Sequence, residues 1–173
     1  MKKAVTTVAL ILVSVFAFSG AAVYAADKPY AFVNAAKLFD EYQKTKDNDA
    51  VLQQEGQAKE KERNVIVEDI RKMKDEIELL SDEAKKTKQE TMNQRIRDLQ
   101  DFDMKTRQEL MQKRQTIVEE IFAEIDQVVQ KYGKEKNLDY IINDRAVLYQ
   151  NEAYNITPVI LEELNKNYQQ KKK

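Results

Sequence analysis

The sequence that decides the fold is the run from Gln57 to Tyr132, QAKEKERNVIVEDIRKMKDEIELLSDEAKKTKQETMNQRIRDLQDFDMKTRQELMQKRQTIVEEIFAEIDQVVQKY. These 76 residues contain neither glycine nor proline, and 34 of them are charged. A loop or a compact sheet of this length needs turn residues, so the composition predicts extended helical structure. A single helix would measure about 114 Å. Because no globular core encloses such a rod, we expect a mechanical or adhesive function.

Apolar residues repeat along this run with the spacing of a coiled coil. In the first half they alternate spacings of four and three residues: Ile66, Ile70, Met73, Ile77 and Leu80. The second half continues the seam with Met92, Ile96, Leu99, Leu110, Ile117, Ile121, Ile125, Val128 and Tyr132. Between them, Ser81 can cap a new helix, and Asp82 and Glu83 suit the positive end of its dipole. The pattern favours two antiparallel arms of about 50 Å joined near Ser81, with one unbroken rod that dimerises in parallel as the alternative.

The middle of this seam is polar. Small or polar residues occupy core positions of the regular register there: Gly56, Lys59, Arg63, Asp103 and Thr106. Such a seam packs weakly, because a buried charge needs a partner or water. Two interpretations remain open. One is a soft section about which the arm bends, and the other is a shifted register that uses Val65, Phe102 and Leu110.

Residues 1–25 have the organisation of a secretory signal peptide. A positive start, Met1-Lys2-Lys3, precedes an apolar run of 15 residues from Ala4 to Phe18, and Val23-Tyr24-Ala25 supplies a small-residue cleavage pattern. The apolar run is shorter than the ~20 residues that span a bilayer. We therefore expect cleavage after Ala25, with Ala26 as a near alternative, and an exported, soluble mature protein without stable membrane insertion.

The composition excludes several classes of function. The chain has no cysteine and no histidine, so the usual zinc and transition-metal sites and the Ser-His-Asp and Cys-His nucleophiles cannot form. Without Lys2 and Lys3 the mature chain has 27 basic and 30 acidic residues, a net charge of −3, which gives no reason to expect nucleic acid. Carboxylates spaced along a solvated rod have no pocket for acid–base chemistry. We predict no enzyme, no catalytic residues, no metal and no cofactor.

The N-terminal end of the mature chain predicts a strand followed by a helix. Tyr30-Ala31-Phe32-Val33 has the aromatic and β-branched content of a short strand. Asn34 fits the N-cap of a helix that starts at Ala35. Asp47-Asn48-Asp49 is expected to break or re-cap this helix, although a smooth continuation remains possible.

The C-terminal end predicts a β-hairpin and a last helix. Gly133 is expected to end the second arm, because glycine tolerates positive φ. The runs Leu138–Ile142 and Ala146–Tyr149 are expected to pair as antiparallel strands across a turn. Thr157 is the expected N-cap of the last helix, with Pro158 at its first position. Lys171 to Lys173 are expected to form a solvated tail.

The two ends together predict a body of residues 26–49 and 133–173, from which an arm of residues 50–132 projects with its tip near 80–86. A body of about 60 residues is marginal as an independent core. Neighbouring copies that share their strands would complete it. The predicted oligomer interface consists of Phe32, Ile142, Leu148 and Tyr149.

This order of elements resembles the Skp/OmpH family of periplasmic chaperones. The similarity lies in Tyr30–Asn34 followed by Leu38-Phe39, and in the two C-terminal apolar runs followed by Ile156-Thr157. It implies a homotrimer in the periplasm, with three helical hairpins around a cavity that holds unfolded outer-membrane proteins without nucleotide. The best-known members are strongly basic, whereas this mature chain is slightly acidic, so no lipid-binding residues are carried over.

Sequence and resemblance together predict a mainly α-helical chain with a small β body, an α+β class, and a long antiparallel coiled-coil hairpin. The expected function is that of an ATP-independent holdase whose client-contacting residues the sequence does not identify. The alternative is a structural coiled-coil adaptor or spacer of the cell envelope.

Overall fold

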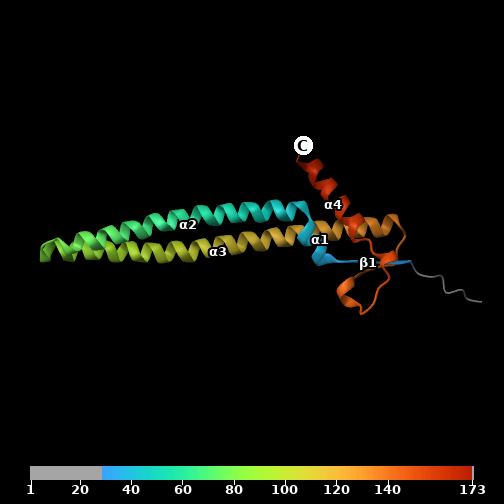
Figure 1. The fold of residues 1–173 in the computed structure, drawn as a ribbon, viewed down its shortest axis with the longest axis horizontal. Helices are drawn as coiled ribbons and strands as arrows, with labels where there is room; N and C mark the ends of the chain where they lie inside the picture. Colours follow the sequence, from blue (N-terminus) through green and yellow to red (C-terminus); the bar gives the residue numbers. More distant parts are fainter. Residues whose placement is uncertain (1–28, 173) are drawn as a thin grey trace, which may run out of the picture.

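Two long helices dominate the structure, a computed structural model that describes residues 29–172 (Figure 1). Helix α2, Gln43–Glu78, and helix α3, Asp82–Glu135, lie side by side as an antiparallel hairpin. Their 36 and 54 residues correspond to about 54 Å and about 81 Å. The predicted hairpin is confirmed, and the single unbroken rod is wrong. The predicted signal peptide lies outside the described residues.

The tip of the hairpin is a turn without glycine. The amides of Leu79 and Leu80 donate to the carbonyls of Glu76 and Ile77, at 3.1 and 3.3 Å. These i→i+3 bonds tighten the last turn of α2 and satisfy carbonyls that a helix end leaves unpaired. Ser81 occupies the N-cap position of α3 with an extended backbone, but its side chain makes no capping bond.

The body contains a two-stranded parallel sheet. Strand β1, Tyr30–Val33, pairs with β2, Tyr140–Asn143, so that Phe32 lies opposite Ile142. On the other edge of β1, Phe32 forms a bridge with Asn155, and the amide of Ile156 donates to the Phe32 carbonyl at 2.9 Å. The first strand of the described chain is therefore flanked on both sides by segments from its C-terminal end.

The core lies where α3 passes α1 (Ala35–Glu41), α4 (Thr157–Lys171) and the inner face of the sheet. Its buried apolar residues come from both chain ends and from α3: Ala31, Val33, Leu38, Tyr42, Ile121, Ile125, Val128, Ile156, Ile160 and Leu164. Helix α3 thus belongs to the arm along most of its length and to the core near its end.

The predicted β-hairpin is wrong. Residues 144–146 form a 3-10 helix, η1 (Asp144–Ala146), and residues 146–149 form no strand with any part of the chain that the structure describes. A second 3-10 helix, η2 (Glu152–Tyr154), follows. The strand at 140–143 pairs instead with β1, because this register buries Ile141 with Ala31 and Val33 against the core.

Gly133 does not end α3. The helix continues to Glu135, Gly133 is buried within it, and the left-handed residue beyond the end is Asn137, with φ of 52°. A Cβ on Gly133 would lie 3.2 Å from Cδ1 of Ile141. This glycine is therefore used for close packing against β2 and not for a turn.

Two of the predicted caps have different outcomes. Asn34 caps α1 as predicted, its side chain accepting from the Lys37 amide at 2.6 Å. Thr157 is not the N-cap of α4, since Ile156 occupies that position and Thr157 is the first helical residue. Its Oγ1 instead accepts from the Asn34 amide at 2.9 Å, which ties α4 to the start of α1. Pro158 lies in the first turn of α4, one position later than predicted, because the helix begins at Thr157.

The break in the N-terminal helix falls earlier than expected. Helices α1 and α2 are separated by Tyr42 alone, whose backbone is extended (φ −61°, ψ 128°). Residues 47–49 lie inside α2, so the expected break there is wrong and the smooth continuation is right. The Tyr42 side chain is buried in the core, and this burial fixes the position of the break.

Candidate assembly surface and helical arm

The sheet has a second apolar face, directed away from the helical core. Side chains alternate along a strand, so Tyr30 and Phe32 lie opposite to the core residues Ala31 and Val33. The parallel register places Tyr140 and Ile142 beside them. The Tyr30 ring lies 5.6 Å from the Phe32 ring and 4.8 Å from the Tyr154 ring. Tyr30 and Tyr140 remain 42% and 55% exposed, an unusual placement for a cluster of aromatic rings.

The connection from β2 to α4 exposes the other two predicted interface residues. Leu148 and Tyr149 are fully or almost fully exposed, with 108% and 84% of their surface accessible. Val147 before them has an extended backbone, with φ −127° and ψ 149°. This segment extends to one side of the body as a loop (Figure 1). Leu148 lies at a bend, and the apolar stretch has no partner strand among residues 29–172.

Two polar atoms of the same connection are buried without a hydrogen bond within the described structure, Asp144 Oδ1 and Gln150 Oε1. Buried polar groups of native proteins are nearly always paired. The other Asp144 oxygen, Oδ2, accepts from Asn34 Nδ2 at 2.6 Å. One oxygen of Asp144 thus anchors the start of the loop, while its other oxygen and Gln150 Oε1 lack hydrogen-bond donors within the described structure.

The four predicted interface residues therefore divide into two pairs. Phe32 and Ile142 are register neighbours on the outer face of the sheet, and Leu148 and Tyr149 lie on the exposed connection. Sequence reasoning missed Tyr30, Tyr140 and Tyr154, which share that outer face or border it. The first two lie two positions before Phe32 and Ile142, so strand alternation could have found them.

The polar middle of the arm is held by ion pairs between the two helices. Arg63 Nε lies 2.9 Å from Asp103 Oδ1, so two predicted core positions pair with one another. Of the shifted register, Val65 is wrong, since it is 60% exposed, whereas Phe102 and Leu110 are half-buried. Further pairs join the helices along their length: Asp69 with Arg95, Glu76 with Lys88, Glu55 with Lys113, and Lys44 with Glu120 and Glu124.

Small residues leave a gap between the arm helices at mid-height. A cavity of about 290 Å³ lies there, with Ala58 and Leu110 in its wall and charged side chains at its rim. A Cβ on the nearby Gly56 would meet no atom within 4 Å. The arm is therefore loosely packed where the coiled-coil pattern is weakest.

The tip of the arm presents leucine to solvent. Leu79 is 88% exposed and Leu80 is 36% exposed. Together with Ala84, Thr87 and Thr91 they line an open groove of about 670 Å³, which the ion pair of Glu76 with Lys88 borders. Exposed leucine at the far end of a charged rod is a feature that solubility alone does not explain.

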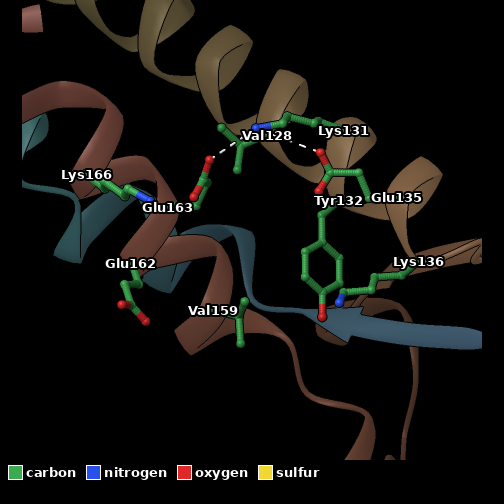
Figure 2. Close-up of a pocket in the computed structure, with 9 residues that line it drawn as sticks. All are labelled: Val128, Lys131, Tyr132, Glu135, Lys136, Val159, Glu162, Glu163 and Lys166. Carbon is green, nitrogen blue, oxygen red and sulfur yellow. Dashed lines mark hydrogen bonds and ion pairs between the residues drawn. The ribbon is translucent and has the colours of Figure 1, made fainter. Parts of the chain in front are cut away.

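A cleft of about 420 Å³ lies in the body between α3 and α4 (Figure 2). Val128, Tyr132 and Val159 supply its apolar wall, and charged side chains surround it. Lys131 lies 3.2 Å from Glu163 and 3.9 Å from Glu135. The hydrogen bond from Lys131 lowers the pKa of Glu163, so this carboxyl is ionised at neutral pH and unsuited to donate a proton.

The root of the arm contains a half-buried carboxylate, Glu124. Its Oε2 accepts from the Tyr42 hydroxyl at 2.9 Å, and its Oε1 lies 3.0 Å from Lys171 and 3.3 Å from Lys44. Burial alone raises the pKa of Glu124, but the bonds from Lys171, Tyr42 and Lys44 outweigh it and the net pKa is lowered. Burial, together with this carboxylate, raises the pKa of Tyr42 far above its ordinary value.

Residues 29–172 contain no group of three or more acidic side chains arranged to hold a metal ion. In the same part of the chain, no helix combines the length and the apolar character that crossing a membrane requires.

Comparison with known proteins identifies the architecture. The family model described as "Outer membrane protein (OmpH-like)" matches residues 29–164. The fold is similar to the crystal structure of "a putative outer membrane chaperone (OmpH-like)" from Caulobacter crescentus CB15, with a TM-score of 0.75 and 14% identity over 80% of this chain and 85% of that one. No curated protein sequence matches the chain. Because the family model covers the strands, both arm helices and most of α4, the chain belongs to the OmpH-like family of outer membrane proteins.

Proposed function

We propose that this protein is an ATP-independent holdase chaperone of the periplasm, which binds unfolded outer-membrane proteins between the helical arms of a homotrimer. Family membership and the described name of the Caulobacter structure support a chaperone role in general. The observation that carries the specific proposal is the exposed apolar surface of the body, at the base of a charged arm.

The assembly step rests on that surface. The exposed Leu148-Tyr149 segment, together with Phe32 and Ile142 in the sheet, suits β-augmentation by a neighbouring copy. A strand edge invites pairing with another chain, and the outer face beside it exposes Tyr30 and Tyr140, while Phe32 is buried and Ile142 is half-buried. Pairing would also supply partners for the buried oxygens of Asp144 and Gln150.

The binding step follows from the arms. Several arms fixed to one body would contact the same unfolded chain at once, and linked weak contacts gain affinity through high effective concentration. The arm offers such contacts at its loosely packed middle and its leucine tip. Binding of this kind needs no nucleotide and no single recognition motif.

The test separates assembly from chaperone activity. Leu148→Glu should dissociate the trimer, because a charge would be buried in the shared sheet; light scattering measures the mass. The wild-type trimer at substoichiometric amounts should stop an unfolded β-barrel protein from aggregating. A mutant that stays fully assembled contradicts the interface, and a trimer without effect on aggregation contradicts the chaperone role.

The exposed tip favours a second candidate, a coiled-coil adaptor that bridges envelope components. Leu79 and the groove beside it form a ready contact at the far end of the arm. Replacing residues 80–86 by a short flexible loop discriminates between the two. An adaptor would lose its partner, whereas a cage of arms would keep most of its aggregation-suppressing activity.

A further inference from the structure

The last turn of α4 reaches the root of the arm and contacts both arm helices. Lys171 Nζ lies 3.0 Å from Glu124 Oε1 on α3. The next residue, Lys172, pairs with Asp47 Oδ2 on α2. The sequence predicts a solvated tail here, but the structure uses these two lysines to join three helices.

Each of the two carboxylates has other partners that orient it. Asp47 accepts from the Tyr168 hydroxyl at 2.9 Å and from Gln43 Nε2 at 2.8 Å. The bonds from Lys172, Gln43 and Tyr168 lower the pKa of Asp47 to about 2, so it is charged at neutral pH. Glu124 is held in the same way by Tyr42 and Lys44. Both carboxylates are therefore held in place by other residues, and the end of α4 binds to them.

The chain connection between α1 and α2 does not by itself fix the angle between the arm and α4. Helix α3 runs from arm to body without interruption, whereas α2 is separated from α1 at the single extended residue Tyr42. The position of α2 relative to α4 depends on contacts at this root. These include the amide of Gln43, which donates to Asn165 Oδ1 at 2.9 Å, and the pair of Lys172 with Asp47.

The two lysine contacts are the weak members of the network. Their side chains are 68% and 61% exposed, whereas Glu124 and Asp47 are 22% and 30% exposed. Ion pairs with exposed partners contribute little and are screened by salt. They can therefore open while the apolar core keeps the body folded.

We propose that the last turn of α4 is a salt-sensitive clasp, in which Lys171 on Glu124 and Lys172 on Asp47 fix the angle between the arm and α4. Among the polar contacts of residues 29–172, release of the clasp leaves only the Tyr168–Asp47 and Gln43–Asn165 hydrogen bonds between α4 and α2, so the arm can swing away from α4 by bending of α3 beyond the core. The clasp stands on its own geometry, and only its consequence, a wider cavity between arms, rests on the proposed function.

The test measures the distance between the arm and α4, which changes with the angle between them. Since the chain has no cysteine, Lys61→Cys on α2 and Glu162→Cys on α4 accept spin labels without side reactions, and labelled chains are diluted in excess unlabelled protein. Electron–electron distance measurements on wild type should give a narrow distribution at about 0.05 M salt and a broad one at about 1 M. In K171Q/K172Q the distribution should already be broad at low salt, with a roughly fivefold larger share of long distances.

Matched variants keep the result specific. K72Q/K74Q removes the same charge from exposed arm lysines that make no ion pair among the described contacts, and it should behave as wild type. K171R/K172R keeps the charges and should stay narrow at low salt. A second label pair, Lys61→Cys with Gln108→Cys on α3, reports the arm itself and should not change in K171Q/K172Q.

Three outcomes would overturn the clasp. These are an unchanged α2–α4 distribution in K171Q/K172Q at low salt, an equal broadening of the arm pair, and a loss of helicity by circular dichroism. The last would make the lysines a folding requirement and not a reversible contact. Aggregation suppression is measured separately, so failure of the chaperone role is distinguishable from failure of the clasp.

Discussion

The two glycines of the long helices serve different purposes at the residue scale. Gly56 of α2 faces open space, and a Cβ there would contact nothing within 4 Å. Gly133 of α3 is buried, and a Cβ there would meet Ile141 Cδ1 at 3.2 Å. A glycine inside a helix costs stability through backbone entropy. At Gly133 this cost is offset by close packing against Ile141, and at Gly56 it is not.

Substitution by alanine should therefore separate the two positions. Gly56→Ala should raise the free energy of unfolding by about 0.5–1 kcal/mol, from helix propensity and reduced unfolded-state entropy. Gly133→Ala should give no gain, and Gly133→Val should cost about 2 kcal/mol through overpacking. Urea unfolding at one fixed protein concentration measures all three. Equal stabilisation by both alanines would contradict the packing role of Gly133.

Tyr42 should make the stability depend on alkaline pH. Its pKa is raised in the folded state, so the protonated hydroxyl is favoured by folding. A raised folded-state pKa contributes stability that is fully present below the unfolded value of about 10 and is lost as the pH rises above it. Tyr42→Phe should therefore be less stable than wild type at neutral pH, and the difference should shrink above pH 10. Denaturation at several pH values tests this, and a constant difference would contradict it.

At the scale of elements, the arm combines a weak apolar seam with cross-helix ion pairs. The pair of Arg63 with Asp103 shows how the hairpin keeps its register where leucine and isoleucine are missing. Both side chains are more than a third exposed, so the pair contributes modestly to stability. Its main effect is on register, because a slip of one turn would leave both charges without their partners.

Charge reversal tests this register. Arg63→Glu should lower the free energy of unfolding by about 1 kcal/mol, because it faces Asp103, and the double change R63E/D103R should recover more than half of the loss. Arg107→Glu, at an exposed position of α3, serves as the control and should be near neutral. Thermal unfolding of wild type, R63E, D103R and R63E/D103R gives the coupling energy, and a double variant no better than R63E would contradict the pairing.

At the scale of the whole molecule, the body depends on both ends of the chain. Leu164 of α4 is 1% exposed within a core that also contains Ala31 of β1 and Ile121 of α3. The arm inserted between these ends therefore rests on contacts that α4 closes. A change in α4 should weaken the whole body, not a local segment.

Leu164→Ala should cost about 3 kcal/mol, from lost burial and the cavity it leaves. Val159→Ala, in the same helix but 48% exposed, should cost less than about 1 kcal/mol. Differential scanning calorimetry of the two variants makes the comparison. Similar costs would mean that the core does not depend on α4 as the structure indicates.

Most of the fold was predictable from sequence, but its junctions were not. The long helices followed from a charged run without glycine or proline, the hairpin was favoured over a single rod by the predicted cap at Ser81, and the Asn34 cap followed from its own side chain. The β-hairpin and the glycine cap at Gly133 were wrong, because both positions are decided by contacts with distant segments. Of the predicted interface, Phe32 and Ile142 lie together in the sheet, and their role in assembly stays a prediction.

The sequence by itself determined the rods, since helix formation and heptad spacing depend on residues only a few positions apart. Only the tertiary structure decided the parallel pairing of β1 with β2, the pairing of Arg63 with Asp103, and the attachment of the C-terminal lysines at the arm root. Each joins groups far apart in the chain. Such contacts form because the folded core brings these segments together, and the local sequence around each residue does not predict them.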